Sequence, residues 1–337
     1  TANDDTIIDL ITGLRRAGML SGVRTAARNI IGNALSATLD EVAQIPAVLV
    51  DVILGKFTKV RTRARTGDAI LPSFSTAVRK GLRDSWDTIK TGGTPGELGK
   101  YDFPKELNFQ AAARGKNLAS PLNTYVNFVM RFQGAYDKPA RAYATKRSLI
   151  ESAKVAAMNE GLRGQTFTNR VKELVLNPTE AMQIRAIADA EEAILGNDSL
   201  FARKVNEIKQ MNEASKLIGD FAIPFTRIPS NIVGRVVESS PIGLVFNATK
   251  AITLVKKGAI TPDLQRQISK QIGRGSVGTA LIWLGVEMGR AGIISGRFDF
   301  RSKDTDEATG KTPNGIKIGD KMYRISDSVI GMLLSIG

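Results

Sequence analysis

The segment that decides the fold is "GTALIWLGVEMGRAGIISG", residues 278–296, near the end of a chain of 337 residues. It carries five glycines among Leu, Ile, Val, Met, Ala and one Trp. A glycine inside a helix costs about 0.8–1 kcal/mol relative to alanine, so this set costs about 4–5 kcal/mol unless close packing offsets the loss. The apolar residues nevertheless recur with a helical period. We therefore expect residues 264–296 to form one long glycine-rich helix.

The glycines of this helix are predicted to form a smooth stripe on one face. At about 100° per residue they fall within roughly 60° of arc, and their GxxxG spacings allow another backbone to approach closely. Glu287 and Arg290 lie on the far side, where they can pair, and they disfavour a lone lipid-facing span. The partner of the stripe is either the same chain, or another subunit or a bilayer. The predicted packing seam consists of Gly278, Gly285, Gly289, Gly292 and Gly296.

Composition excludes several kinds of active site. The chain has no Cys and no His, so disulfides, Cys nucleophiles, Cys/His zinc sites and Ser-His-Asp triads are absent from it. No pair of carboxylates is placed as an acid and a base, and no glycosidase or polymerase motif is present. We therefore predict that the chain is not an enzyme and has no catalytic residue, no metal ligand and no cofactor.

The charge of the chain points to a polyanionic neighbour. The formal net charge is +14, which favours nucleic acid or an anionic membrane surface as a partner. Cations gather in "KFTKVRTRARTGD", residues 56–68, where Asp68 is the only opposing charge. This cluster is either a site for DNA phosphate or lipid headgroups, or a solvated face. The candidate contact residues are Lys56, Lys59, Arg61, Arg63 and Arg65.

The remaining pattern predicts a mainly α fold, an elongated multi-helix bundle with a small C-terminal β-hairpin. Pro46 is expected to kink or break its helix, Pro241 is expected to interrupt one, and Ser230 or Asn231 is expected to cap a new one. The Gly/Pro-rich loop lacks the GxxxxGK[ST] and GxGxxG frames of nucleotide sites. The expected regions are an N-terminal helical region with the basic cluster (1–90), the Gly/Pro-rich loop (91–123), a central helical region (124–220), Pro-interrupted and Gly-rich helices (221–296), and the hairpin with the start of a further helix (297–337).

One motif resembles a known family. The segment "FAIPFTRIPSNIVGRVVESSPIG", from residue 221, is similar to a signature of the large internal virion proteins of tailed bacteriophages, the DNA-ejection or large polyvalent proteins of podovirus-like phages. The stretches "MRFQGAYDKPARAYA" (130–144), 278–296 and "NGIKIGDKMYRISD" (314–327) also fit that family. The motif residues are Pro224, Phe225, Arg227, Pro229 and Asn231, followed by Ser240, Pro241, Ile242 and Gly243.

The resemblance implies a structural role in genome delivery. Such proteins are packaged inside the capsid and expelled ahead of the genome, and they build a channel across the host envelope. The resemblance implies a ring-like homo-oligomer, contacts with other ejection, portal or tail proteins, nonspecific contact with DNA, and a place in the periplasm or inner membrane of the host after ejection.

Two alternatives stay open at this point. One is a nonspecific DNA-binding core or scaffold module inside the capsid, and the other is a segment of a larger virion enzyme, a transglycosylase or an RNA polymerase. The chain starts at Thr1 and stops within the apolar run "ISDSVIGMLLSIG", so we expect it to be the interior of a longer polypeptide.

Overall fold

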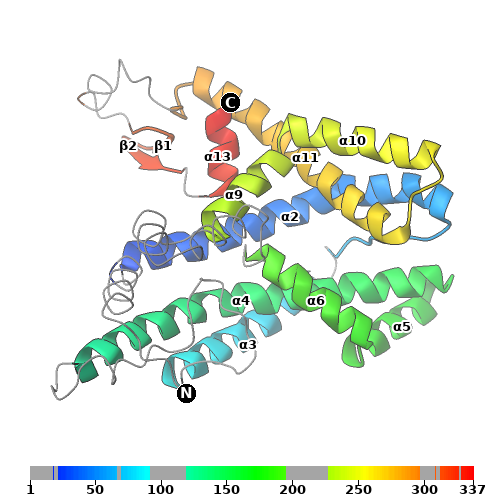
Figure 1. The fold of residues 1–337 in the computed structure, drawn as a ribbon, viewed down its shortest axis with the longest axis horizontal. Coiled ribbons are helices and arrows are strands. Elements are labelled where there is room, and N and C mark those ends of the chain that lie inside the picture. Colours follow the sequence, from blue (N-terminus) through cyan, green and yellow to red (C-terminus); the bar gives the residue numbers. More distant parts are fainter. Residues whose placement is uncertain are drawn as a thin grey trace, which may run out of the picture. The chain divides into compact units, whose positions relative to one another are not determined.

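The predicted fold class is confirmed: the protein is mainly α-helical, with one small antiparallel hairpin near its C-terminal end (Figure 1). The structure is a computed structural model that describes residues 18, 22–66, 70–91, 119–194, 227–296, 308, 312–325 and 328–337. Its elements are α2 (Val23–Thr58), α3 (Ile70–Thr91), α4 (Ala119–Asn159), α5 (Gly164–Leu176), α6 (Glu180–Ala193), α9 (Arg227–Glu238), α10 (Pro241–Lys256), α11 (Pro262–Arg290), β1 (Gly315–Ile318), β2 (Lys321–Arg324) and α13 (Val329–Ile336).

The interruption expected at Pro241 is present, because α9 ends at Glu238 and α10 begins at Pro241. Ser240 caps α10 with its hydroxyl, which accepts a hydrogen bond from the Gly243 N–H, and Pro241 occupies the first turn. Thr261 caps α11 in the same way through the Leu264 N–H. The expected hairpin is also present, with Ile316 opposite Tyr323. Local side-chain chemistry is therefore enough to fix these boundaries.

Two expected helix boundaries are absent, a break at Pro46 and a cap at Ser230 or Asn231, while a kink at Pro46 stays a prediction. Pro46 does not break the first described helix, because α2 continues through it from Val23 to Thr58. No cap forms at Ser230 or Asn231, because α9 already begins at Arg227 and both residues lie inside it. In both places the surrounding helix outweighs the local preference of one residue.

The glycine-rich helix is shorter than expected. It ends at Arg290 rather than at residue 296, and Gly292 follows with a φ of +69°, the left-handed conformation that commonly terminates a helix. The Ile293 N–H then bonds the Met288 carbonyl. Only the first three of the five seam glycines therefore belong to α11.

The chain packs as two compact units, and the five consecutive regions expected from the sequence stay a prediction. Each unit combines segments that are far apart along the chain, because helices pack against neighbours that the sequence order does not reveal. Unit 1 takes residues 1–33, 74–144 and 188–231, and unit 2 takes residues 34–73, 145–187 and 232–337.

In unit 1, α3 packs closely on α4. A Cβ at Gly81 would lie 2.4 Å from the Cα atom of Pro139, so the two backbones are in direct contact there. The Ser85 hydroxyl lies 2.7 Å from the Ala135 carbonyl oxygen and bonds it across the same interface. These two contacts hold the helices together near the middle of α4.

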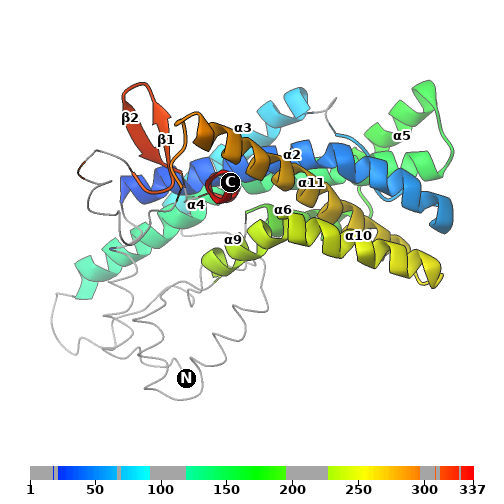
Figure 2. The same ribbon diagram turned by 90° about the horizontal axis from the view of Figure 1, so that it is seen from above.

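In unit 2, α2, α10 and α11 pack side by side (Figures 1 and 2). Leu54 of α2, Ala251 of α10 and Ile268 of α11 form one buried apolar cluster near the C-terminal ends of α2 and α10. A second cluster joins Leu39 of α2 to Val329 and Leu333 of α13. These small clusters leave much of the interior to polar side chains.

Candidate functional site

A short strap without regular secondary structure, residues 61–66, follows α2 and is largely buried in unit 2. α2 ends at Thr58, and Lys59 turns the chain with a φ of +63°. Residues 61–66 then form neither helix nor strand, and most of them are buried. Asn159 of α4 bonds the backbone of Arg61 twice: its side-chain oxygen accepts the Arg61 N–H and its amide donates to the Arg61 carbonyl, each at 2.9 Å. The Asn159 side chain therefore bonds both polar groups of the Arg61 backbone, as the backbone of a neighbouring β-strand would do.

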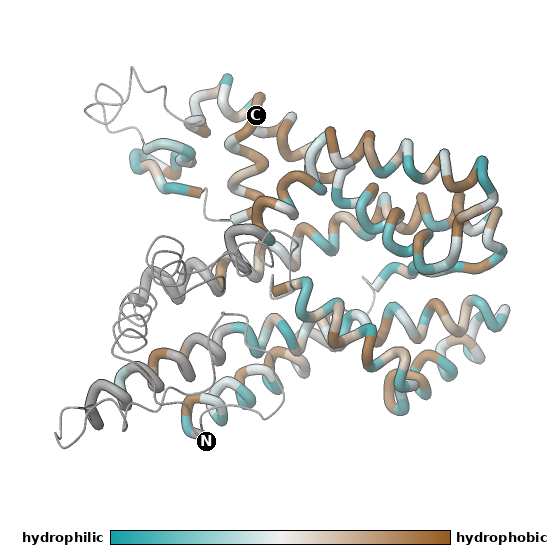
Figure 3. The backbone as a smooth tube through the Cα atoms, in the orientation of Figure 1, coloured by the Kyte–Doolittle hydropathy of each residue, from teal (hydrophilic) through white to brown (hydrophobic). Residues whose placement is uncertain are grey.

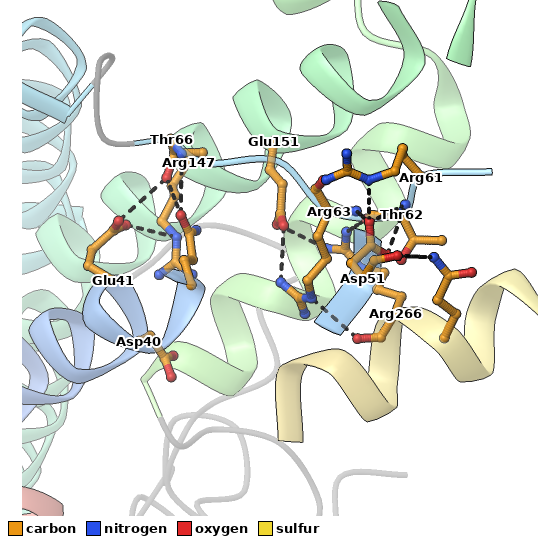
Figure 4. Close-up of polar contacts among 12 residues, drawn as sticks. Asp40, Glu41, Asp51, Arg61, Thr62, Arg63, Thr66, Arg147, Glu151 and Arg266 are labelled. Carbon is orange, nitrogen blue, oxygen red and sulfur yellow. Dashed lines mark hydrogen bonds and ion pairs between the residues drawn. The ribbon is translucent and has the colours of Figure 1, made fainter. Parts of the chain in front are cut away.

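Asp51 anchors the start of this strap. Its side chain is fully buried, and Arg61 donates to it at 2.9 Å. The backbone N–H groups of Thr62 and Arg63 donate to the same carboxylate at 3.1 Å, and Gln265 of α11 donates at 2.7 Å (Figure 4). A buried carboxylate is tolerated only when its lone pairs are satisfied in this way.

Glu151 of α4 lies between two guanidinium groups. Arg63 of the strap donates to it at 3.0 Å, and Arg266 of α11 approaches it at 3.4 Å (Figure 4). The side chains of Arg63 and Glu151 are each only 4% exposed. The strap is therefore fixed to both α4 and α11 by buried charge.

Asp40 of α2 lies in a second cluster of the same kind. Arg235 of α9 donates to it at 2.7 Å and Arg274 of α11 at 2.9 Å, and the three side chains are 3–7% exposed. Burial alone would raise the pKa of Asp40, but the positive charges of Arg235 and Arg274, with help from Arg147 and Lys270, hold the pKa well below its usual range. Asp40 therefore stays ionised and joins α2, α9 and α11.

These contacts involve only some residues of the basic cluster predicted from the sequence. Arg63 is buried against Glu151, with its side chain 4% exposed, so it is not available to an external anion. Arg61 pairs with Asp51 but its side chain remains 31% exposed, so its contact with an external anion stays a prediction. A buried carboxylate attracts the nearest guanidinium, which the run of cations alone does not reveal. Lys56, Lys59 and Arg65 are exposed, and their contact with phosphate or headgroups stays a prediction.

The sequence carried one signal for the partners of these arginines. Asp51 stands within the almost wholly apolar stretch of residues 47–54, and a carboxylate at such a place requires a cation or several N–H donors. No comparable signal marks Asp40 or Glu151, because both are surrounded in the sequence by ordinary helical residues. Only the packing of distant helices brings their partners to them.

At two positions of the glycine seam, Gly278 and Gly285, the backbone of the same chain packs directly against the glycine. A Cβ at Gly278 would lie 1.9 Å from the Ser239 carbonyl oxygen, and one at Gly285 would lie 2.1 Å from that of Leu334. Nothing lies within 4 Å of a Cβ at Gly289 or Gly292, and Gly296 has one such neighbour, the Ser335 carbonyl oxygen at 4.0 Å. The partner at the two buried positions is thus the chain's own backbone rather than a second subunit or lipid. The predicted Glu287–Arg290 pair forms at 2.8 Å.

Large apolar side chains lie on the outer faces of unit 2, opposite to the buried charges. Figure 3 shows hydrophobic residues recurring along α10. On α2 the exposed side chains recur at intervals of three and four residues, which places them on one face. They are Val42, Ile45, Leu49, Val52, Ile53 and Phe57 on α2, and Ile242, Val245, Phe246 and Ile252 on α10, all at least 40% exposed.

The family-like motif is only partly described. Pro224 and Phe225 lie outside the described residues, Arg227 begins α9, and Pro229 and Asn231 lie within that helix. Comparison with known proteins finds no family model, no curated protein and no solved structure that matches this chain. The resemblance to phage ejection proteins therefore stays a prediction.

The buried clusters are suited to hold helices together. Their arginines and carboxylates are paired with one another, so they offer a ligand no uncompensated charge. Among the described residues, no group of acidic side chains is arranged to hold a metal ion. Within the same part of the chain, no helix combines the length and apolar character needed to cross a bilayer.

The turn at Lys59 provides a test of how the strap is held. A non-glycine residue in the left-handed region costs about 1 kcal/mol, so we expect Lys59→Gly to raise the free energy of unfolding by about that amount. Lys56→Gly, three residues earlier inside α2, should lower it by a similar amount. Urea unfolding followed by circular dichroism measures both. If Lys59→Gly destabilises the protein as Lys56→Gly does, the described turn is wrong.

Proposed function

We propose that this chain is a structural protein of a bacteriophage particle, ejected ahead of the genome, which assembles with copies of itself into part of a channel across the host envelope. The observation that carries the proposal is the distribution of polar and apolar side chains in unit 2. Acidic and basic side chains such as Asp40, Asp51 and Arg274 are buried there beside the apolar clusters, while many large apolar side chains are exposed. The sequence resemblance supplies the phage context.

This distribution supports self-assembly. Most exposed apolar residues on a soluble protein are scattered, whereas a gathered apolar face marks a surface that another molecule covers. On α10 the exposed apolar side chains alternate with Thr249 and Thr253, and Phe246 is 66% exposed near the middle of the helix. An aromatic anchor with polar neighbours is typical of protein–protein interfaces. We therefore assign the α10 face to contact between copies.

The alternative of a DNA-binding core module has a narrower basis than the sequence indicated. Two of its five candidate cations, Arg61 and Arg63, pair with internal carboxylates. The net charge of +14 still supports nonspecific DNA contact, with Lys56, Lys59, Arg61 and Arg65 as candidates. The absence of enzymatic activity stays a prediction, which zymography of the 337-residue chain on cell-wall material would check.

The proposal predicts a defined oligomer that depends on the α10 face. Val245→Gln together with Phe246→Gln should shift the full chain toward monomer by about tenfold or more in dissociation constant, because two anchoring side chains lose their burial. Mass photometry measures the shift, with and without detergent, and negative-stain images show whether the wild type forms rings with a lumen wide enough for duplex DNA.

A matched control separates this interface from a general effect of polar substitution. Ile184→Gln with Ile187→Gln changes two side chains of α6 that are about as exposed, at 61% and 59%, as Val245 and Phe246. These changes should leave the oligomer intact. A wild type that stays monomeric under every condition refutes self-assembly, and equal loss in both double variants refutes the assignment to α10.

A further inference from the structure

We propose that the outward face of α2 binds the surface of a bilayer containing anionic lipids, with its apolar side chains among the acyl chains and its C-terminal lysines among the headgroups. The inference rests on the proposed function, since a protein ejected into a cell envelope meets such a surface. It goes beyond that function by naming the face and the chemistry of its partner.

The α2 face is more uniformly apolar than the α10 face. From residue 42 to residue 57 its exposed residues are six large apolar side chains and one charged residue, Lys56. No Ser, Thr, Asn or acid interrupts them on this face. The α10 face, by contrast, includes Thr249 and Thr253. Because protein interfaces mix apolar and polar groups, the α2 face is better matched to lipid.

The cations at one end of the face supply the charge complementarity. Lys56 and Lys59 are exposed at the C-terminal end of α2, next to the exposed Phe57. Lys256 and Lys257 are exposed at the C-terminal end of α10, which packs beside α2 through Leu54 and Ala251 (Figures 1 and 2). No acid occurs in residues 52–60 or 250–262. Lysines and an aromatic side chain at the end of an apolar stretch are typical anchors at a membrane interface.

The interior of unit 2 agrees with a lipid-facing exterior. Within membranes, polar and ionised side chains turn toward the centre of a helix bundle, and small residues let the helices approach closely. α2 follows this pattern, with Asp40 and Asp51 turned inward and Ala43 and Ala47 against Gly273 of α11. The face from residue 42 to residue 57 is about 22 Å long, shorter than the hydrocarbon core of about 30 Å. We therefore place α2 along the bilayer surface.

Vesicle flotation tests this inference. The full chain should float with vesicles of phosphatidylethanolamine and phosphatidylglycerol, and far less with vesicles of phosphatidylcholine alone. Ile53→Gln should weaken binding about tenfold, because an apolar contact is lost. Lys56→Gln with Lys59→Gln should weaken it about fivefold for each lysine, and high salt should remove that difference.

Two matched variants serve as controls. Ile252→Gln changes a side chain on α10 that is 57% exposed, as Ile53 is. Lys172→Gln with Lys317→Gln removes two exposed lysines from α5 and β1. Vesicle binding should be unchanged in both, and circular dichroism should show that every variant remains folded.

The outcomes separate this inference from the proposed function. Flotation that is absent, equal on both lipid mixtures, or equally reduced by Ile53→Gln and Ile252→Gln overturns the lipid assignment and leaves the oligomer measurement untouched. Loss of the oligomer in Ile53→Gln without loss of flotation assigns the α2 face to a second copy instead. Flotation that follows the predicted pattern in a monomeric protein supports the lipid surface and refutes the proposed assembly.

Discussion

Replacing Gly278 with alanine should lower the free energy of unfolding by about 3 kcal/mol, toward the upper end of what overpacking a well-packed core costs. The added Cβ would lie 1.9 Å from the Ser239 carbonyl oxygen, which is far inside van der Waals contact. The obstacle is backbone, so a change of rotamer cannot relieve it, and α11 must move away from the α9–α10 corner. Thermal and urea unfolding of the purified chain measures the loss.

The same helix supplies the opposite result as a control. Gly289 lies eleven residues further along α11, with nothing within 4 Å of a Cβ built on it. Gly289→Ala should therefore raise the free energy of unfolding by up to about 1 kcal/mol, the gain in helix propensity. If Gly278→Ala and Gly289→Ala destabilise the protein equally, the close contact between Gly278 and the Ser239 carbonyl oxygen is refuted.

The second large effect is expected at Asp40. Asp40→Asn should lower the free energy of unfolding by about 3–5 kcal/mol, because the buried Arg235 and Arg274 would lose the carboxylate nearest to them and Arg274 would keep the more distant Glu238 at 3.4 Å. The asparagine keeps the size and one acceptor oxygen, so the loss reports charge rather than volume. Replacing all three residues by Leu, Met and Met should recover much of the stability, since an apolar cluster needs no charge compensation.

The Asp40 carboxylate makes the free energy of unfolding depend on pH. The pKa of Asp40 is lower in the folded protein than in the unfolded chain, so its contribution is complete above about pH 4 and is lost as the pH falls toward the folded value. Unfolding free energies measured between neutral pH and pH 2 should decline less steeply in Asp40→Asn than in the wild type. If the unfolding free energies of the wild type and of Asp40→Asn fall equally steeply as the pH is lowered, the two arginines do not stabilise the charged form of Asp40.

The buried charges give unit 2 a particular kind of specificity. Each carboxylate joins elements from different parts of the chain, as Glu151 joins the strap to α4 and α11. Such pairs add little net stability over an apolar core, but a wrong arrangement would leave a charge buried alone. They therefore favour one packing of the helices.

Much of the fold was predictable from the sequence because it depends on neighbours along the chain. The helical class, the hairpin around Gly319, the caps at Ser240 and Thr261 and the Glu287–Arg290 pair all involve residues within a few positions of one another. Hydrogen bonds of this range are encoded by spacing alone. The glycine stripe was likewise visible, as a surface that some backbone had to approach.

Only the tertiary structure decided which residues contact each other when they are far apart along the chain. The sequence could not show that Arg63 turns inward, because Glu151 is 88 residues from Arg63 along the chain. It could not show that Ser239 fills the seam at Gly278, or that Pro46 stays inside a continuous helix. The spacing of residues along a helix determines which side chains share a face. The side chains that pack against that face come from distant segments, and their positions depend on the packing of the whole chain.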